Sequence, residues 1–356
     1  MKLNGSDIIA EVLIEQGVDT IFGYPGGAVL NIYDALYKYR DKIHHILTAH
    51  EQGASHAADG YARATGKTGV VIATSGPGAT NLVTGIATAY MDSIPMVAIT
   101  GNVGTSYIGK DAFQEVYITG ITMPITKHNF FVSDIKELAP TLREAFKIAN
   151  SGRKGPVLVD IPKDVTAAIT EYEKAAPEVI IDNTVINEDE VKKAAALINK
   201  AKRPVIEIGG GVVSSEASDL VRMLVNKTGA PCCHTLMAAG VLGYSEKLNY
   251  GLVGMHGSFV TNKAIDEADV LVAIGTRFSD RVALNTNRFA HKAKVIQIDI
   301  DLSEIDKNVK VDHALVGDVK TIVMDLLHYV KQSDRTDWLK TLDEYKNSDY
   351  HPVEIG

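Results

Sequence analysis

The feature that most constrains the fold is a repeated order of short apolar run, glycine-containing turn and helical pattern. Residues 69–74 are an apolar run that ends in Ser75-Gly76-Pro77-Gly78, and helical spacing follows over residues 80–92. Unbroken apolar strands that alternate with helices are typical of a parallel sheet covered on both faces. We therefore predict a doubly wound α/β fold, in which ligands bind at the carboxyl ends of the strands.

The alternation occurs in two blocks separated by a stretch of different character. Residues 1–165 form the first block and residues 188–335 the second, and 356 residues is a natural length for two domains. Between them, residues 166–187 have mixed charge, no clear period and an interrupting Pro177, which predicts a linker. The pattern then fades, so residues 336–356 are interpreted as a tail that leads to a further, C-terminal domain.

Composition and charge argue against several classes of protein. The net charge is −8 with scattered Lys and Arg, which does not favour nucleic-acid binding. The two cysteines, Cys232 and Cys233, are adjacent; their number excludes a disulfide framework and fits a reducing compartment. No apolar run approaches the roughly 18 residues of a membrane span, and the N-terminus lacks a signal-peptide pattern. We therefore expect a cytoplasmic protein without a membrane partner.

Two strand-to-helix junctions carry candidate functional residues. Glu51 begins a predicted helix, where the helix dipole alone favours an acidic residue. The glycines of Ser75-Gly76-Pro77-Gly78 allow a close approach of backbone to ligand, or they form a packing turn. No lysine follows them, so a Walker-type phosphate loop is excluded. Spacing alone leaves open whether Glu51 is catalytic or only begins a helix. It also leaves open whether the glycine turn binds a ligand or only packs.

The order of several motifs resembles the pyrimidine-binding domain of acetolactate synthases, a family of thiamine-diphosphate-dependent enzymes also called acetohydroxyacid synthases. The resemblance rests on six blocks in the same order: Gly23-Tyr24-Pro25-Gly26-Gly27, His50-Glu51-Gln52-Gly53-Ala54, Thr74-Ser75-Gly76-Pro77-Gly78, Ala112-Phe113-Gln114-Glu115, residues 120–128, and residues 155–164. It implies the two-domain α/β fold and gives individual residues a role.

In that family a glutamate hydrogen-bonds N1′ of the cofactor's aminopyrimidine, which favours the tautomer whose N4′ removes the C2 proton. The resemblance assigns this role to Glu51, because a buried carboxyl group can share a proton with a ring nitrogen. It also implies that Gly27 lies close to the reacting carbons, where a residue without Cβ fits. Phe113, Gln114 and Lys163 would line the substrate channel, although a loop glutamine and a turn lysine need no such role. Cofactor contacts are further implied for Pro25 and Gly76.

The second block resembles the FAD-binding domain of the same family. The triplet Gly209-Gly210-Gly211 is weak by itself, because turns use glycine freely. The other matching residues are Thr235, Leu236, Met237, Met255, His256, Gly257, Gly275, Arg277, Asp299 and Asp318. Arg153 and Arg277 are expected to help hold FAD, since arginine suits phosphate recognition, and Arg281 to face the active site. Fermentative members of the family commonly lack FAD; these segments favour the flavin-containing, biosynthetic type.

The motif with which thiamine enzymes bind the diphosphate through Mg²⁺ is Gly-Asp-Gly with a later Asn, and this pattern does not occur in the sequence. The resemblance therefore implies a Mg²⁺ site in a domain after Gly356, and we assign no metal ligand here. His128 and His256 lack a second ligand at helical spacing. We expect that this chain alone does not form acetolactate.

The implied activity is decarboxylation of pyruvate and its ligation to a second 2-oxo acid, giving 2-acetolactate or 2-aceto-2-hydroxybutyrate in branched-chain amino-acid biosynthesis. The expected substrates are pyruvate and 2-oxobutyrate. The expected partners are a second copy, as a homodimer or homotetramer, and a regulatory small subunit. The alternatives are another thiamine enzyme, such as a pyruvate oxidase or a fermentative acetolactate synthase, and a non-catalytic fragment that binds FAD or dimerises.

Overall fold

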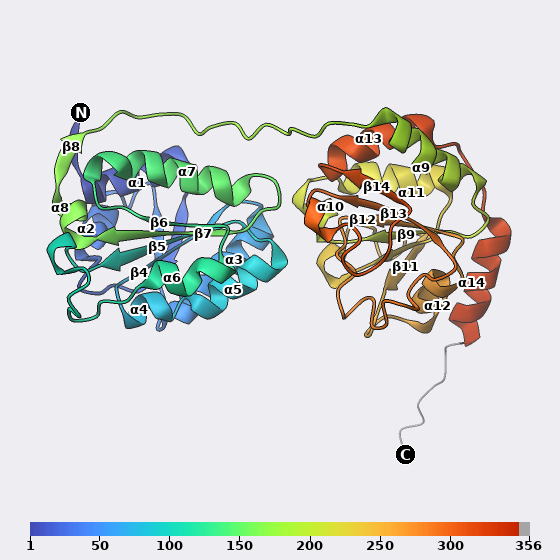
Figure 1. Cartoon of the computed structure of the whole chain (residues 1–356), viewed down its shortest axis with the longest axis horizontal. Coiled ribbons are helices and arrows are strands. Elements are labelled where there is room, and N and C mark those ends of the chain that lie inside the picture. Colours follow the sequence, from blue (N-terminus) through green and yellow to red (C-terminus); the bar gives the residue numbers. More distant parts are fainter. Residues whose placement is uncertain (349–356) are drawn as a thin grey trace, which may run out of the picture. The chain divides into compact units, whose positions relative to one another are not determined.

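The computed structural model describes residues 1–348 and divides the chain into two compact units, 1–181 and 182–356 (Figure 1). Each unit is an α/β body built around its own six-stranded sheet. The predicted fold class, two doubly wound parallel-sheet domains, is confirmed. Across these residues no helix combines the length and the apolar character that a membrane span requires.

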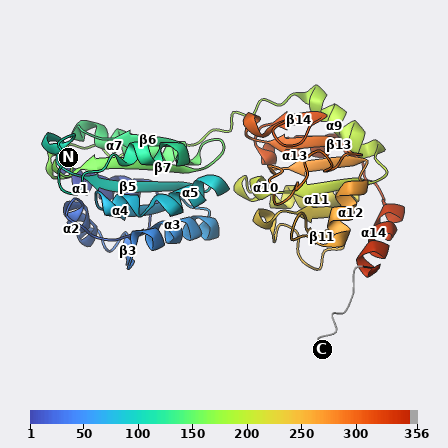
Figure 2. The ribbon, with the colours of Figure 1, turned by 60° about the horizontal axis from the view of Figure 1, so that its bottom comes forward.

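The first unit contains a parallel sheet in the order β3-β2-β4-β5-β7-β6. Its strands are β2 (Thr20–Gly23), β3 (His44–Leu47), β4 (Gly69–Ala73), β5 (Met96–Asn102), β6 (His128–Phe131) and β7 (Pro156–Pro162). Strands β3, β5, β6 and β7 are labelled in Figure 2. Every residue of β4, β5 and β7 is buried, as expected for central strands that are covered on both faces. Strand β6 was not expected from the sequence, because His128 and Asn129 interrupt its apolar pattern.

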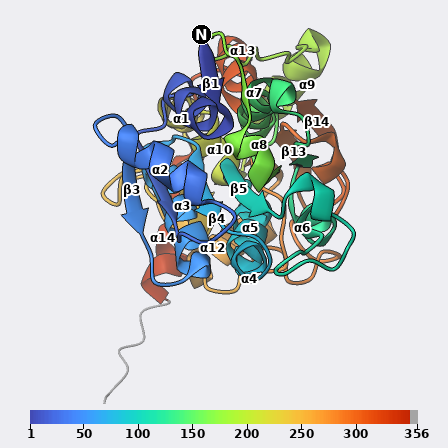
Figure 3. The same cartoon turned by 90° about the vertical axis from the view of Figure 1, so that its left-hand side faces the viewer.

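Helices cover both faces of this sheet (Figure 3). One core joins the sheet to α1 (Gly5–Glu15), α2 (Leu30–Lys38) and α7 (Leu138–Asn150). The opposite core joins it to α3 (Glu51–Thr65), α5 (Val83–Asp92) and α6 (Ile118–Thr122). Short helices complete the unit: α4 (Pro77–Thr80), α8 (Lys163–Ala167), and single 3₁₀ turns at Thr105–Tyr107, Met123–Ile125 and Ile135–Glu137.

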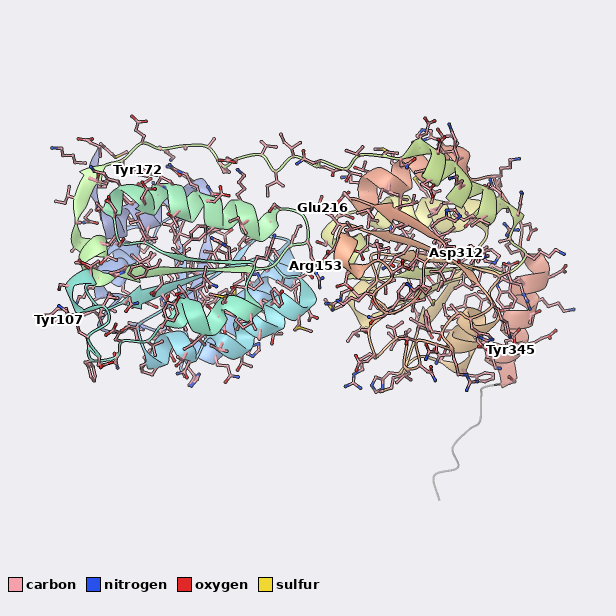
Figure 4. All side chains as sticks on the ribbon, viewed as in Figure 1. Tyr107, Arg153, Tyr172, Glu216, Asp312 and Tyr345 are labelled. Carbon is pink, nitrogen blue, oxygen red and sulfur yellow. The ribbon has the colours of Figure 1, made fainter. Side chains whose placement is uncertain are left out.

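The predicted linker is shorter than residues 166–187. Helix α8 continues the first unit, and β8 (Ile169–Glu171) pairs antiparallel with β1 (Lys2–Asn4). The chain after Glu171 is held by Glu15, whose buried carboxylate accepts hydrogen bonds from Arg143, the Tyr172 hydroxyl and the Ala175 amide (Tyr172 is labelled in Figure 4). Residues 172–187 then have no helix or strand. The pairing across about 170 residues of sequence could not be read from local pattern.

The second unit has a parallel sheet in the order β11-β10-β9-β12-β13-β14. The strands are β9 (Pro204–Ile208), β10 (Cys232–His234), β11 (Asn249–Leu252), β12 (Val270–Ile274), β13 (Lys294–Asp299) and β14 (His313–Val316). The sequence predicted β9, β12 and β13. It did not predict β10, β11 and β14, which are three or four residues long and lie toward the edges of the sheet.

The helices of this unit also lie on two faces. One core contains residues of α9 (Glu188–Lys200), α10 (Gly210–Ser214), α11 (Ser218–Thr228) and α13 (Val319–Tyr329), and the other contains residues of α12 (Phe259–Glu267) and α14 (Thr336–Ser348). Two 3₁₀ turns lie at Leu236–Ala238 and Leu302–Glu304.

Helix α14 corrects the predicted boundary at residue 335. Trp338 and Leu342 are buried in the core of the second unit, and the Trp338 indole nitrogen donates to the Pro204 carbonyl over 3.2 Å. The Tyr345 hydroxyl donates to Glu267 of α12 (Figure 4). Residues 336–348 are therefore part of this unit rather than a tail outside it; the rest of the predicted tail, 349–356, lies outside the described residues.

Candidate functional site

The first unit places its candidate residues at a topological switch point. The chain passes from β2 to β3 on one side and then returns to form β4 on the other side of β2. In doubly wound sheets the crevice outside the carboxyl ends of two such strands is where ligands bind. The turn after β2, Tyr24-Pro25-Gly26-Gly27, and the turn after β4, beginning at Thr74, flank this point. Two of the predicted motifs thus meet although they are 50 residues apart.

Thr74 joins the two turns. A Cβ added at Gly26 would lie 2.5 Å from the Thr74 side chain, and one added at Gly78 would lie 2.7 Å from it. The Ala28 amide donates to the Thr74 hydroxyl over 3.2 Å. At Gly27, by contrast, no atom of the described chain lies within 4 Å of an added Cβ. Within this chain, a side chain at Gly26 or Gly78 would therefore clash with Thr74. A side chain at Gly27 would not clash with the described residues, so any requirement for glycine there must come from a ligand or another group outside those residues.

Glu51 is the first residue of α3, directly after the His50 N-cap, and its side chain turns into the unit: the residue is 8% exposed. Its Oε2 accepts a hydrogen bond of 2.9 Å from Nδ2 of Asn81. Its Oε1 lies 3.2 Å from where a Gly78 Cβ would be and has no hydrogen-bond partner among residues 1–348. One carboxylate oxygen is thus held in place and the other is available to a ligand.

Asn81 had no role in the sequence analysis. It is the C-cap of the short helix α4, which begins directly after Gly76. The available signal was its place at the end of the Thr74–Gly78 motif, but nothing in the sequence linked it to a glutamate on another helix.

Tyr33 of α2 adds a second polar group near Glu51. Burial raises the pKa of the Tyr33 hydroxyl, and the negative charge of Glu51 raises it further. The ring meets His45 edge-on at 4.9 Å, and its buried oxygen has no hydrogen-bond partner among the described residues. A Cβ at Gly23 would come within 2.5 Å of this oxygen, so the β2 turn is closely packed here as well.

Gln114 lies against the Gly76 turn. A Cβ at Gly76, whose φ is +60°, would be 2.7 Å from the Gln114 carbonyl oxygen. Gln114 itself has a φ of +60°, an unusual conformation for a residue with a side chain, which costs about 1–3 kcal/mol and is often retained at functional sites. The neighbouring Phe113 is 86% exposed. The structure therefore brings Gln114 to the predicted site and leaves the Phe113 ring in solvent.

Lys163 follows the carboxyl end of β7 as the first residue of α8 and is exposed. Beside it, Asp160 is buried and accepts hydrogen bonds from Thr100 and Asn102 of β5, over 2.7 and 2.6 Å. Burial raises the pKa of Asp160 to about 6, while the two hydrogen bonds oppose that rise. This network joins the carboxyl ends of β5 and β7, and so fixes the strand from which Lys163 departs.

The second unit has its own switch point, between β9 and β12. The turns that follow these strands pack backbone against backbone. A Cβ at Gly209 would be 2.3 Å from the Gly275 carbonyl oxygen, and one at Gly211 would be 2.7 Å from the Gly275 Cα. The Gly211 amide donates to the Gly275 carbonyl over 3.1 Å. Packing therefore explains Gly209, Gly211 and Gly275, and these turns lie where a ligand of this unit would bind.

Other predicted residues surround this point. A Cβ at Gly210 would be 3.1 Å from Met237, in the turn after Thr235, whereas Leu236 in the same turn is 76% exposed. After β11, the exposed Met255 is held by Arg281: its amide donates to the Arg281 carbonyl over 2.8 Å, and the guanidinium lies 3.3 Å from its sulfur. His256 is exposed and Gly257 half-buried in the same turn.

Asp318 and Asp299, two of the residues that match the FAD-binding segments, have structural partners. Asp318 is the N-cap of α13 and accepts from the amides of Lys320 and Thr321. Asp299, at the end of β13, is 7% exposed and accepts from the Asp301 amide over 2.9 Å. Arg277 follows Gly275 and is half-buried.

Arg153 belongs to the first unit, in the loop between α7 and β7, where its Nε donates to Ser93 over 2.9 Å (Figure 4). Among residues 1–348, no group of three or more His, Cys, Asp and Glu residues is arranged to hold a metal ion.

The comparisons with known proteins agree with this geometry. Residues 3–121 match the family described as thiamine pyrophosphate enzyme, N-terminal TPP binding domain, and residues 191–326 match its central domain. The chain belongs to the thiamine pyrophosphate enzymes.

Three relatives of this chain are described as acetolactate synthases or as their large subunits. The chain is 49% identical to a probable acetolactate synthase large subunit of Methanocaldococcus jannaschii, over 97% of this chain and 59% of that protein. It is 49% identical to an acetolactate synthase of Mycobacterium leprae, over 100% of this chain and 59% of the relative. A large subunit from Buchnera aphidicola is 44% identical over 97% of this chain and 62% of its own length. The chain thus spans about three fifths of the length of the curated relatives it matches.

Proposed function

We propose that this chain provides the cofactor-activating and central domains of an acetolactate synthase. The observation that carries the proposal is the pair Glu51–Asn81: a buried carboxylate with one oxygen fixed and one available, next to the two turns that flank a switch point. The identity of 44–49% to acetolactate synthases supports it. The proposed substrates are pyruvate and a second 2-oxo acid, either pyruvate or 2-oxobutyrate.

The residues present fit the pyrimidine end of thiamine diphosphate. Oε1 of Glu51 can hold a proton against a ring nitrogen, while Asn81 keeps the carboxyl group in one orientation. When bound, the cofactor supplies the carbanion chemistry, and the protein positions and polarises it. Gln114, held against Gly76, has an amide that can donate to a substrate oxygen, and the Lys163 ammonium can attract a carboxylate. Burial of Glu51 keeps bulk water from competing for its proton.

We further propose that the second unit binds FAD, that Mg²⁺ is held outside residues 1–348, and that the enzyme works as a homo-oligomer in the cytoplasm. The switch point between β9 and β12, with exposed Leu236, Met255 and His256 around it, supports a planar ligand in this unit. The names of two relatives, large subunit, support a small-subunit partner. Flavin fluorescence, titrated with the chain, tests the FAD site directly.

The decisive experiment compares this chain with a chimera in which it is continued by the C-terminal part of the M. jannaschii relative. With thiamine diphosphate, Mg²⁺, FAD and pyruvate, we expect acetolactate from the chimera and none from the chain alone. Sustained turnover by the chain alone would overturn the expectation that it is inactive. Reduction of the flavin by pyruvate in the chimera would favour the alternative, a pyruvate oxidase.

A further inference from the structure

A buried polar pair lies in the middle of the second sheet. Glu207 of β9 and Gln297 of β13 are each in register with Ala273 on the strand between them, β12. All three residues are fully buried. Residues in register on neighbouring parallel strands point to the same face. Because the Ala273 side chain ends at Cβ, the longer side chains on either side of it have room to extend toward each other.

Both side chains contact Thr276, the residue after Gly275. The Thr276 hydroxyl donates to Oε1 of Glu207 over 2.9 Å, and Nε2 of Gln297 donates to the Thr276 carbonyl over 3.2 Å. The two remaining oxygens, Oε2 of Glu207 and Oε1 of Gln297, are buried and have no hydrogen-bond partner among the described residues. A buried polar atom left in this state destabilises the fold, because it has lost its hydrogen bonds to water without gaining a partner.

A single proton on Glu207 would give both oxygens a hydrogen bond. The Gln297 amide orientation is fixed, because turning it would place its oxygen against the Thr276 carbonyl, which only accepts. Gln297 Oε1 therefore needs a donor, and an ionised Glu207 has none, whereas a carboxylic acid has one. We propose that Glu207 is a neutral carboxylic acid that donates from Oε2 to Gln297 Oε1, and that this pair positions the Thr276 peptide beneath the Gly209–Gly211 turn.

The surroundings favour the neutral form. Burial raises the pKa of Glu207 to about 7, opposed by the hydrogen bond from Thr276, and no neighbouring charge contributes. The titratable neighbours on β10 are Cys233, in register with Glu207, and Cys232; burial raises the pKa of both thiols, which keeps them uncharged. On β13, Asp299 lies two residues beyond Gln297 on the same face. The apolar core on this face includes Val260 and Ala264 of α12, Trp338 and Leu342 of α14, and Phe278 from the loop after β12. The buried Thr261 of α12 is uncharged and donates to the Leu252 carbonyl.

The pair acts on the candidate site through backbone. The two turns approach closely, since a Cβ at Gly209 would lie 2.8 Å from the Thr276 Cα and the Gly211 amide donates to the Gly275 carbonyl, so we expect a shift of Thr276 to disturb the glycine turn. Glu207 and Gln297 are thus positioning residues. The inferred effect of this pair on a ligand rests on the proposed flavin site. The inferred hydrogen bond between Glu207 and Gln297 is independent of that site.

Infrared spectroscopy of the whole chain at pH 6 tests the shared proton. Asp160, whose pKa is about 6, also contributes protonated-carboxyl absorption at this pH. We expect a further C=O band that Glu207→Gln removes and that Gln297→Leu shifts to higher frequency, because the acceptor is lost. Thr276→Val, which removes the donor to Oε1, should also shift the band and serves if Gln297→Leu does not fold. Glu15→Gln is the control: Glu15 is also buried, but, although burial opposes it, hydrogen bonds from Arg143, Tyr172 and Ala175 hold its pKa below 4.5, so no protonated-carboxyl band should be lost. A band unchanged by Glu207→Gln overturns the neutral acid, and one insensitive to both neighbours overturns the pairing.

FAD titration tests the positioning. Glu207→Gln keeps a donor and an acceptor and should bind FAD as the original chain does, whereas Glu207→Leu should bind it more weakly. Equal binding by Glu207→Leu overturns the positioning role. Absence of FAD binding by the original chain would instead refute the flavin site and leave the infrared result standing.

Discussion

Asn81, at the end of the short helix α4, donates to Oε2 of Glu51, the first residue of α3, over 2.9 Å. The bond fixes the rotamer of a buried carboxyl group whose second oxygen faces the turn at Gly78. Glu51 follows β3 and Asn81 follows β4, so the sheet order brings together two residues from strands that do not pair with each other.

The first prediction concerns Glu51. In the chimera described above, Glu51→Gln should lower acetolactate formation by about 10²–10⁴-fold, the usual contribution of a positioned proton-transfer group. The glutamine keeps the hydrogen bond with Asn81 but cannot release a proton. Glu137→Gln, at an exposed position before α7, is the control and should leave the rate unchanged. A Glu51→Gln chimera of full activity would remove Glu51 from the mechanism.

Asn81→Ala should reduce kcat in the same chimera by about 10–100-fold, because a hydrogen bond to a charged group is worth about 1.5–3 kcal/mol. Thr80→Ala, in the same helical turn, removes only a bond to the Pro77 carbonyl and should have little effect. If the two variants behave alike, Asn81 acts through the shape of α4 and not through Glu51.

Gly26 and Gly27 form a matched pair. Gly26→Ala places a Cβ 2.5 Å from Thr74, so it should lower the free energy of unfolding by about 1–3 kcal/mol, as overpacking does. Gly27→Ala meets no atom within 4 Å and should leave the unfolding free energy of this chain nearly unchanged. Urea denaturation measures both. If Gly27→Ala nevertheless lowers turnover in the chimera, the cause is contact with a ligand.

Arg143 compensates the buried carboxylate of Glu15, whose side chain has no exposed surface. Despite the cost of burial, the hydrogen bonds from Arg143, Tyr172 and Ala175 hold the pKa of Glu15 below its ordinary value of 4.5. This contribution is present above pH 4.5 and is lost as the pH falls below it. Arg143→Leu should cost about 3 kcal/mol at pH 7, because it leaves a buried carboxylate without an opposite charge. The exposed pair Lys147–Glu178 is the comparison: Lys147→Ala should cost at most about 1 kcal/mol.

Glu207 should give the opposite pH dependence. Its pKa is raised from 4.5 to about 7, so the folded state binds more protons than the unfolded state between these values. Stability is therefore expected to fall as the pH rises from 4.5 to 7, by up to about 3 kcal/mol, and to stay low above pH 7. Glu207→Gln should remove this part of the slope and be more stable than the original chain at pH 8. The slope that remains between pH 3.8 and 6 comes from Asp160, whose buried carboxyl group also has a raised pKa, about 6. A parallel slope in both proteins would show that Glu207 does not titrate in this window.

The two parallel-sheet units follow from the sequence pattern, because long apolar strands that alternate with helical patterns are typical of sheets covered on both faces. Motifs that resemble acetolactate synthases also directed attention to Glu51, Gly76 and Gln114, and the roles assigned to these residues stay predictions. Local pattern failed for β10, β11 and β14, since three or four residues carry too little periodicity, and it gave no sign that Trp338 and Leu342 would bury α14 in the core of the second unit.

Which side chains contact one another could be learned only from the three-dimensional structure. Asn81 with Glu51, Thr74 with Gly26, and Glu207 with Gln297 through Thr276 are pairs whose members lie far apart in the chain. Each pair depends on strand order and register, which sequence pattern does not encode. Which of two neighbouring glycines must lack a side chain, Gly26 or Gly27, likewise depends on what the fold packs against it.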